Sequence, residues 1–364
     1  MKKVILLATT DLVADQRVHR SALTLHENGF TVLALGRRLK YTPTEVSVSY
    51  SVHRFKLLFN KGFLFYKFFN VRAFFYLVFH SFDILLANDL DALLAARVAC
   101  FLKGKPLVYD SHELFTEVPE LINRKFTRSV WLKLEKSLVP GLKFCTTVSE
   151  GVASELKKRY SVNFTVIRNV PFYKEISKTD FTSDGKTIIY QGALNIGRGL
   201  EKLIAAMQLL PHCKLLIAGT GDIEQKLKNL CHNLGLQDRV SFLGRIPHEE
   251  LHLITCKATI GVSLEEDLGL SYHFALPNKL FDYIQAGLPV LVSNLPEMKS
   301  LVSKYSVGLI VDSNLNASAL ANQLEKMLEN EKQLEQWHAN AVVAAKELCW
   351  EKERHKLLDI FKEM

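Results

Sequence analysis

The 364-residue chain lacks several features that would assign it at once to a class of protein. Its six cysteines are scattered and include no CxxC pair, which argues against a disulfide framework and against a zinc site. No uncharged stretch reaches the ~18 residues that a membrane-spanning helix needs. The apolar run from Val4 to Ala8 is soon followed by Asp11, so it fits a buried strand better than a signal peptide. Zinc-finger spacing and RNP motifs are also absent, so we expect no nucleic acid as a partner.

Glycine is missing from the first predicted strand–helix turn, residues 9–17. A dinucleotide site needs a GxGxxG pattern there, so that the backbone can approach the pyrophosphate. This absence argues against an enzyme that uses NAD or FAD. The turn carries Asp11, Asp15, Arg17 and His19 instead, at the carboxyl end of a predicted strand. These side chains could contact an acceptor, or they could be a helix cap with solvated charges.

Apolar strands alternate with helical patterns along the whole chain. The hydrophobic content of 48% and the charged content of 23% are those of a soluble globular protein. Continuous apolar strands separated by helices are typical of parallel, doubly wound α/β sheets. The series restarts near Thr187, so we predict two Rossmann-like domains that face a central cleft, with ligands at the carboxyl ends of the strands. The predicted parts are a first domain at 1–176, a linker at 177–186, a second domain at 187–346, and a C-terminal helix at 347–364 that packs back on the first domain.

A short segment at residues 276–290 combines a predicted helix N-terminus with a cation. Lys279 lies in the first turn, and Asp282 follows three residues later. A helix N-terminus has unpaired N–H groups and a partial positive charge, so together with Lys279 it suits a phosphate or diphosphate. Asp282 could accept hydrogen bonds from sugar hydroxyls. An ordinary amphipathic helix with a glycine C-cap has the same spacing and is the alternative.

Glycine-rich turns follow three strands of the second predicted domain. The turn at 190–199 carries Arg198 between two glycines, where it could bind a diphosphate bidentately. The turn at 218–222 has a G-x-G pattern that lets the backbone approach a ligand, and the turn at 242–247 could line a base pocket. A plain strand–turn–helix is the alternative for the first turn. The residues that we assign to donor binding here are Gly192, Gly197, Gly219, Gly221, Gly244 and Arg245.

Two acidic clusters follow strands of the first predicted domain. The DxD at residues 88–91 could bind a divalent metal or an acceptor, or Asp89 could cap the next helix; we expect no metal. The segment at 109–114 places Asp110, His112 and Glu113 at the end of a strand. His112 could bond a sugar hydroxyl or a phosphate, or relay a proton, and a capping cluster is the alternative.

A basic, aromatic-rich segment covers residues 54–80. Such a helical segment can lie on an anionic membrane, and the net charge of +8 suits an anionic partner. Aromatic residues at helical spacing are more often part of a core, so both interpretations stay open. The basic residues of the segment are Arg54, Lys56, Lys61, Lys67 and Arg72.

Together these motifs resemble those of the retaining glycosyltransferases of family four, which have the two-domain GT-B fold. The resemblance covers nearly the whole chain. The segments that carry it are Asp110-Ser111-His112-Glu113, Thr147-Val148-Ser149, Arg168-Asn169-Val170-Pro171, the loop from Gly192 to Gly199, Ala218-Gly219-Thr220-Gly221, Phe242-Leu243-Gly244, and the run from Pro277 to Val290.

The resemblance implies roles for particular side chains. Arg198 and Lys279 should bind the donor diphosphate, and Asp282 should hold the ribose hydroxyls in place of the second glutamate of the family. His112 matches the histidine that lies beside the reacting sugar in the family.

Two positions depart from the family pattern. Phe274 stands where the first glutamate is expected, with His273 and Tyr272 as neighbours that could replace it. Ala193 stands where an arginine is usual.

The resemblance implies a retaining, metal-independent, hexosyltransferase-like enzyme without a cofactor. It should move a sugar from a nucleoside-diphosphate sugar to a glycan or lipid-linked acceptor. The basic aromatic segment suggests a lipid-linked acceptor in cell-surface polysaccharide synthesis. The alternatives are a non-catalytic binding protein for sugar nucleotides or glycans, and a sugar-nucleotide epimerase. We expect a cytoplasmic location, at the inner face of the membrane. The expected catalytic residues are His112, Arg198 and Lys279; Asn278, Asp282 and His273 join the donor site, and Asp11, Arg17, Asp89 and Glu113 are expected to bind the acceptor.

Overall fold

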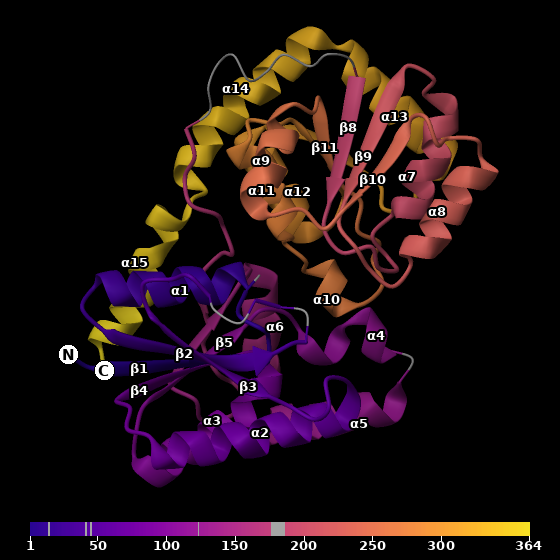
Figure 1. Cartoon of the computed structure of the whole chain (residues 1–364). Coiled ribbons are helices and arrows are strands. Elements are labelled where there is room, and N and C mark those ends of the chain that lie inside the picture. Colours follow the sequence, from indigo (N-terminus) through magenta and orange to yellow (C-terminus); the bar gives the residue numbers. More distant parts are fainter. Residues whose placement is uncertain (14, 41, 44–45, 123, 176–185) are drawn as a thin grey trace. The chain divides into compact units, whose positions relative to one another are not determined.

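The chain forms two compact units in the computed structural model shown in Figure 1. Unit 1 comprises residues 1–169 and 353–364, and unit 2 comprises residues 170–352. The predicted α/β class with two parallel-sheet domains is confirmed. The structure describes residues 1–13, 15–40, 42–43, 46–122, 124–175 and 186–364.

The boundary between the units lies at Asn169 and not at the expected residue 176. Hydrogen bonds explain this difference, because Trp350 N donates to Pro171 O at 2.8 Å and Lys174 N donates to Gln285 Oε1 at 3.1 Å. These bonds tie the residues after Asn169 to unit 2. The expected linker at 177–186 lies outside the described residues up to position 185.

Unit 1 is built on a seven-stranded parallel sheet with the strand order β3-β2-β1-β4-β5-β6-β7. Its central strands are apolar and buried, which is why both faces of the sheet carry helices. In Figure 1, α2, α3 and α5 lie on one side of the sheet and α1 on the other. The strands are β1 (Lys3–Leu7), β2 (Thr31–Arg38), β3 (Ser51–Lys56), β4 (Ile84–Asn88), β5 (Leu107–Ser111), β6 (Phe144–Thr147) and β7 (Thr165–Val166), and the helices are α1 (Gln16–Glu27), α2 (Gly62–Phe79), α3 (Leu90–Lys103), α4 (Pro119–Ile122), α5 (Lys125–Leu138), α6 (Glu150–Tyr160) and α15 (Trp350–Lys362).

The end of the chain belongs to unit 1 from Glu353 onward. There Phe361 of α15 packs edge-on against Phe30, with ring centroids 5.8 Å apart, and Lys356 Nζ donates to Val166 O at 3.1 Å. The last helix therefore contributes both an apolar contact and a polar contact to the first unit.

Unit 2 is built on a six-stranded parallel sheet with the order β10-β9-β8-β11-β12-β13. Its core is aliphatic: Ile188, Leu215 and Val262 from the sheet pack with Leu203 of α7 and Leu324 of α13. The strands are β8 (Lys186–Gln191), β9 (Cys213–Ala218), β10 (Val240–Gly244), β11 (Ile260–Ser263), β12 (Val290–Ser293) and β13 (Gly308–Val311), and the helices are α7 (Leu200–Ala206), α8 (Glu224–Asn233), α9 (His248–Cys256), α10 (Leu270–His273), α11 (Asn278–Gln285), α12 (Pro296–Tyr305), α13 (Ala317–Glu329) and α14 (Glu331–Glu347).

Candidate functional site

Helix α11 is fixed to the sheet of unit 2 by Tyr283. The Tyr283 ring is buried over Gly261, where an added Cβ would lie 2.5 Å from the ring. Its hydroxyl lies 3.2 Å from Val262 O and accepts from Gln191 N at 3.0 Å. This packing holds the first turn of α11, and with it Lys279, near the carboxyl end of β8.

The glycine-rich turns of unit 2 pack directly on one another. Gly219 has a φ of 144°, and a Cβ there would lie 1.8 Å from Gly192 O. A Cβ on Gly221 would lie 2.4 Å from Leu194 O. The close contact between the turns after β8 and β9 leaves no room for a side chain at Gly219 or Gly221, which explains why glycine is needed there. This constraint could not be seen in the sequence. Gly192 in turn faces Lys279, since a Cβ there would lie 3.6 Å from Lys279 Cε.

Two cations share one buried carboxylate at these turns. Lys279 Nζ lies 2.8 Å from Glu265 Oε1, and Arg198 Nη1 lies 3.3 Å from the same oxygen. Each cation also lies over an aromatic ring, Lys279 over Tyr190 at 4.0 Å and Arg198 over Tyr272 at 4.7 Å. The two cations and one carboxylate leave a net positive charge, which suits an anionic ligand.

The protonation of this cluster follows from burial and from its charges. Burial lowers the pKa of Lys279 to about 8, with Glu265 opposing the shift and Arg198 adding to it. Burial alone would raise the pKa of Glu265, but the charges of Lys279 and Arg198 outweigh it and lower that pKa to about 2. At pH 7 the carboxylate is therefore ionised and most of the lysine is protonated.

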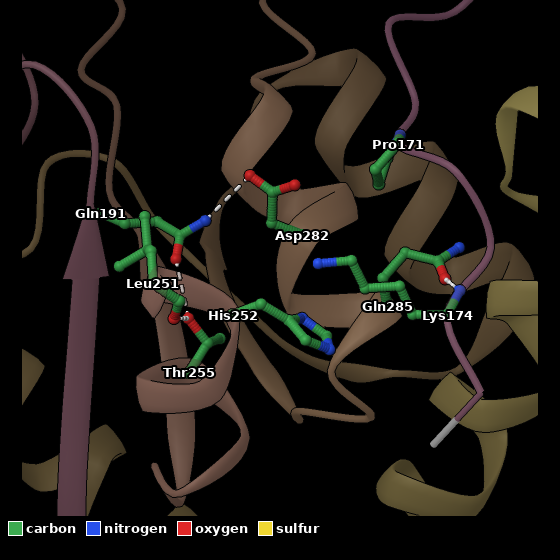
Figure 2. A pocket seen from close by; sticks show the side chains of 8 residues that line it. All are labelled: Pro171, Lys174, Gln191, Leu251, His252, Thr255, Asp282 and Gln285. Atoms are coloured by element: carbon green, nitrogen blue, oxygen red, sulfur yellow. Dashed lines mark hydrogen bonds between the residues drawn. The ribbon is translucent and has the colours of Figure 1, made fainter. Parts of the chain in front are cut away.

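Asp282 lies on the same helix as Lys279 but contacts different partners. Its Oδ2 accepts from Gln191 Nε2 at 2.9 Å, and Gln191 Oε1 lies 3.0 Å from Thr255 Oγ. Figure 2 shows the carboxylate at the edge of a small pocket into which Lys174 and His252 also project. The remaining lining residues are Pro171, Leu251 and Gln285. Lys279 and Asp282, three residues apart, thus have different neighbours, Glu265 for the lysine and Gln191 for the aspartate.

The other expected donor residues lie at the start of α11 and in the turns of unit 2. Asn278 and Arg245 are exposed, at the start of α11 and just after β10. Gly244 O accepts from Gly219 N at 2.8 Å. A Cβ on Gly197 would lie 2.6 Å from Leu268 Cδ1, so a side chain is excluded there.

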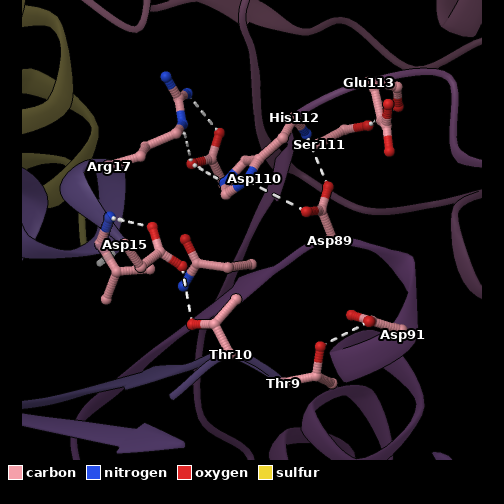
Figure 3. Close-up of polar contacts among 12 residues, drawn as sticks. Thr9, Thr10, Asp15, Arg17, Asp89, Asp91, Asp110, Ser111, His112 and Glu113 are labelled. Atoms are coloured by element: carbon pink, nitrogen blue, oxygen red, sulfur yellow. Dashed lines mark hydrogen bonds and ion pairs between the residues drawn. The ribbon is translucent and has the colours of Figure 1, made fainter. Parts of the chain in front are cut away.

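A second cluster lies in unit 1, where Arg17 of α1 meets Asp110 at the end of β5 (Figure 3). Arg17 Nε and Nη2 donate to the two Asp110 oxygens at 2.7 and 2.6 Å, and Nη1 donates to Ile167 O at 2.9 Å. Thr146 Oγ donates to Asp110 Oδ1 at 2.7 Å. Arg17 is only 4% exposed, and all three of its side-chain nitrogens donate hydrogen bonds within unit 1.

His112 is held between two carboxylates. Its Nε2 lies 3.1 Å from Asp110 Oδ2 and its Nδ1 lies 3.1 Å from Asp89 Oδ2, while its backbone N donates to Asp89 Oδ1 at 2.8 Å. Burial acts to lower the pKa of His112, but Asp89 and Asp110 outweigh it and raise the pKa well above the ordinary value. Both ring nitrogens are thereby used, so the geometry favours a fixed imidazolium charge over a proton relay.

The DxD carboxylates have separate partners. Asp89 stands at the N-cap position of α3, but its side chain makes no capping bond, so the capping alternative is wrong because the carboxylate is engaged with His112. Asp91 accepts from Thr9 Oγ at 2.6 Å, and burial together with Asp89 raises its pKa to about 7. Among the described residues no group of three or more His, Cys, Asp or Glu could hold a metal ion.

The remaining expected acceptor residues, Asp11 and Glu113, make hydrogen bonds within their own turns. Asp11 accepts from Val13 N at 3.2 Å within its own turn. Glu113 is exposed, and its backbone oxygen accepts from Ser111 Oγ at 2.9 Å. Asp15 caps α1 through Val18 N at 3.1 Å, as an aspartate before a helix is expected to do.

Two family models match the chain one after the other. The model "Glycosyltransferase Family 4" matches residues 14–171, and the model "Glycosyl transferases group 1" matches residues 172–343. The chain belongs to the family-four glycosyltransferases. Together the two matches run from residue 14 to residue 343 and include most of both units.

Relatives of this family-four chain are similar over about half of its length. An uncharacterized glycosyltransferase of Methanocaldococcus jannaschii is 28% identical over 47% of this chain and 42% of its own length. A GDP-mannose:cellobiosyl-diphosphopolyprenol alpha-mannosyltransferase of Xanthomonas oryzae is 27% identical over 44% of this chain and 42% of its own length. The matches thus span less than half of these relatives.

Solved structures share the GT-B fold with the family-four chain over its full length. A sucrose-phosphate synthase from Thermosynechococcus elongatus is 18% identical, with a TM-score of 0.84 over 100% of this chain and 99% of that one. Anabaena Alr3699/HepE, solved in complex with UDP-glucose, is 16% identical, with a TM-score of 0.75 over 100% of both chains. The predicted GT-B fold is confirmed.

Glu265 is the functional candidate that the sequence analysis of this family-four chain missed. Phe274, eight residues before Asp282, occupies the position where the family glutamate is expected and is the C-cap residue of α10. The neighbouring His273 is paired with Asp267, with Nδ1 2.9 Å from Oδ2. The position of Glu265 could have identified it, because it follows the carboxyl end of β11, and ligand-binding residues in this fold lie at the carboxyl ends of strands.

Helix α2 of the family-four chain is apolar on both of its faces. Phe65, Phe69, Ala73 and Leu77 recur every four residues and are buried. By length and composition α2 could also cross a membrane. Only 28% of the helix is buried within the structure. The core interpretation of the segment at 54–80 therefore holds for one face of the helix, and the other face is exposed. Its exposed large apolar residues are Phe63, Leu64, Phe68, Val71, Phe75 and Phe79, and the adjacent α3 adds Leu94, Val98, Phe101 and Leu102.

Proposed function

We propose that this chain is a retaining glycosyltransferase that takes its sugar from a nucleoside-diphosphate sugar and needs no metal. The observation that carries the proposal is the cluster of Lys279, Arg198 and Glu265 at the N-terminus of α11. The cluster has one more positive than negative charge, and the helix N-terminus adds N–H groups and a partial positive charge. This is the environment that a departing diphosphate requires.

The chemical role of the cluster is electrostatic. When the bond between the sugar and the diphosphate breaks, negative charge grows on the departing phosphate oxygens. Lys279 and Arg198 stabilise that charge from positions that are already fixed, so little reorganisation is needed during the reaction. The two cations and the helix N–H groups would thereby supply the positive charge that a metal ion supplies in other transferases. His112 adds a fixed positive charge in unit 1, the unit that we assign to the acceptor.

The donor site is tested by a thermal-shift screen against UDP, GDP, ADP, CMP, dTDP and NAD. We expect one nucleoside diphosphate to raise the melting temperature, since a ligand at a hundred times its Kd stabilises by about 2.7 kcal/mol. NAD should have no effect, because the first turn lacks the glycines of a dinucleotide site. A folded protein that responds to none of the diphosphates would contradict the proposal.

Turnover separates the enzyme from its alternatives. Diphosphate sugars with the preferred base are incubated with and without a glycan acceptor. Sugar transfer that requires the acceptor supports the transferase. Nucleotide binding without any turnover would instead indicate a binding protein, and conversion of the donor alone would indicate an epimerase.

We further propose a lipid-linked acceptor and a contact between unit 1 and the inner face of the cytoplasmic membrane. The support is the apolar surface of α2 and α3, on which Phe79 is 78% exposed and Phe101 is 84% exposed. Lys67 on α2 and Lys61, just before the helix, are exposed, and they would meet anionic lipid headgroups there. All six cysteines are free, which fits a reducing compartment.

Liposome binding tests the membrane proposal. Replacing Lys56, Lys61 and Lys67 by glutamine should weaken binding to phosphatidylglycerol vesicles by about a hundredfold, since each basic side chain near an anionic surface contributes ~1 kcal/mol. The measurement is co-sedimentation with vesicles at low salt.

A matched variant controls for the loss of net charge. Lys299, Lys304 and Lys326 of unit 2 are exposed, and their replacement by glutamine removes the same charge elsewhere. Unchanged vesicle binding by the variant at Lys56, Lys61 and Lys67, or an equal loss in both variants, would count against a membrane contact through α2.

A further inference from the structure

A fully buried carboxylate lies behind the two cations of unit 2. The side chain of Glu265 is 0% exposed, that of Lys279 is 7% exposed and that of Arg198 is 23% exposed. Exposure thus increases from the carboxylate to the lysine to the arginine. An anion that approaches from solvent reaches the cations before it reaches Glu265.

Local donors already use the oxygens of Glu265. Oε1 forms an ion pair with Lys279 Nζ at 2.8 Å and accepts from Arg198 Nη1 at 3.3 Å, and Oε2 accepts from Ser263 Oγ at 2.6 Å. A sugar hydroxyl would have to displace one of these donors from a buried position. The geometry therefore suits a role that Glu265 exerts through the two cations and not through contact with a substrate.

We propose that Glu265 is a positioning residue that keeps Lys279 protonated and directs Lys279 and Arg198 toward the donor diphosphate. This inference rests on the proposed donor site. Without the carboxylate, two positive groups that now share one oxygen would repel each other in a buried place. The favourable way to relieve that repulsion is for the lysine to lose its proton, since the guanidinium keeps its own.

The charged and titratable groups around Lys279 come from two strands and the turns that follow them. Glu265 follows β11, Arg198 follows β8, and Tyr190 belongs to β8 itself. Burial and Arg198 both lower the pKa of Lys279, and Glu265 opposes them. Burial raises the pKa of Tyr190, so its phenol stays neutral near pH 7 and pH 8. Asp282, on the same helix as Lys279, bonds Gln191.

The direct test is the titration of Lys279 in the ligand-free protein. Competitive labelling with acetic anhydride, followed by mass spectrometry at a series of pH values, measures the pKa of the amine. We expect Glu265→Gln to lower that pKa by about 1–3 units, the ordinary effect of removing an opposite charge at this distance. Glu265→Asp keeps the charge with a shorter side chain, so its value should fall between those of the wild type and the glutamine variant.

The second test is the pH dependence of donor binding, with GDP-mannose and UDP-glucose as probes in calorimetry at pH 6.5 and 8.0. A lysine attracts a diphosphate only while it is protonated, so affinity falls as the pH rises through the pKa of Lys279. Glu265→Gln should therefore lose more affinity, relative to the wild type, at pH 8.0 than at pH 6.5. A purely structural role would lower affinity equally at both pH values.

The outcomes separate this inference from the proposed function. An unchanged titration of Lys279 in Glu265→Gln overturns the role of Glu265, whatever the protein binds. If neither probe binds the wild type, the proposed donor site fails while the labelling experiment still decides how Glu265 affects Lys279. If Glu265→Gln does not fold, the titration of Lys279 in Glu265→Asp takes its place, and an unchanged value there overturns the inference.

Discussion

Replacing Lys279 by methionine should lower kcat/KM for sugar transfer by about 10²–10³-fold, the usual cost of removing one fixed group that stabilises transition-state charge. Methionine retains most of the apolar stem, which matters because Lys279 is 7% exposed and its Cε packs beside Gly192. The expected loss is therefore one of charge and not of volume. The measurement is steady-state kinetics with the donor found in the nucleotide screen, and the same variant should lose the thermal shift.

The control separates catalysis from stability. Removing Lys279 leaves Glu265 buried with one cation fewer, which should cost about 3 kcal/mol of unfolding free energy. The double variant Lys279→Met/Glu265→Gln removes both charges, so it should regain stability without regaining activity. Lys299→Ala, an exposed change on α12, should alter neither. A Lys279→Met variant that is stable and fully active would contradict the assignment of Lys279 to the donor site.

The fold could be predicted because it follows from local patterns. Runs such as Val4–Ala8 are too apolar to face water, and helices between such strands leave parallel pairing as the arrangement that covers both faces. The position of Lys279 in the first turn of a helix was predicted for the same reason. The boundary at Asn169 was not predicted, because it depends on bonds between residues 171–174 and distant parts of the chain.

The candidate sites could be predicted only in part, because their pairs join distant residues. Glu265 and Lys279 are fourteen positions apart with a helix between them, so no fixed spacing relates them. Arg17 and Asp110 are 93 positions apart, and nothing in the sequence indicates that a charged residue in the first turn of α1 is buried. In α2 nearly every position is apolar, so the pattern could not tell which face would pack on the sheet.

Replacing Arg17 by methionine should destabilise unit 1 by about 3–5 kcal/mol, the cost of leaving a buried charge without its main partner. The bidentate pair with Asp110 is 4% exposed on each side, so solvent cannot replace the guanidinium. Chemical denaturation at pH 7 measures the loss. Arg128→Met is the matched control: its pair with Glu117 is similarly short, 2.7 Å against 2.6 Å, but the arginine is 35% exposed, so the loss should be about 0–1 kcal/mol.

The pH dependence of this loss follows from two opposite pKa shifts in the cluster. Burial would raise the pKa of Asp110, but Arg17 and His112 outweigh it and hold that pKa well below its usual range. Its stabilisation is therefore complete above about pH 5 and is lost as the pH falls toward the folded pKa. The raised pKa of His112 acts in the other sense: its stabilisation is complete below about pH 6.5 and is lost as the pH rises toward the folded value. The wild type should thus be most stable between about pH 5 and 6.5, and the difference from Arg17→Met should shrink below pH 4. A difference that stays constant from pH 7 to pH 3 would show that packing, and not the charge on Asp110, accounts for the effect of Arg17.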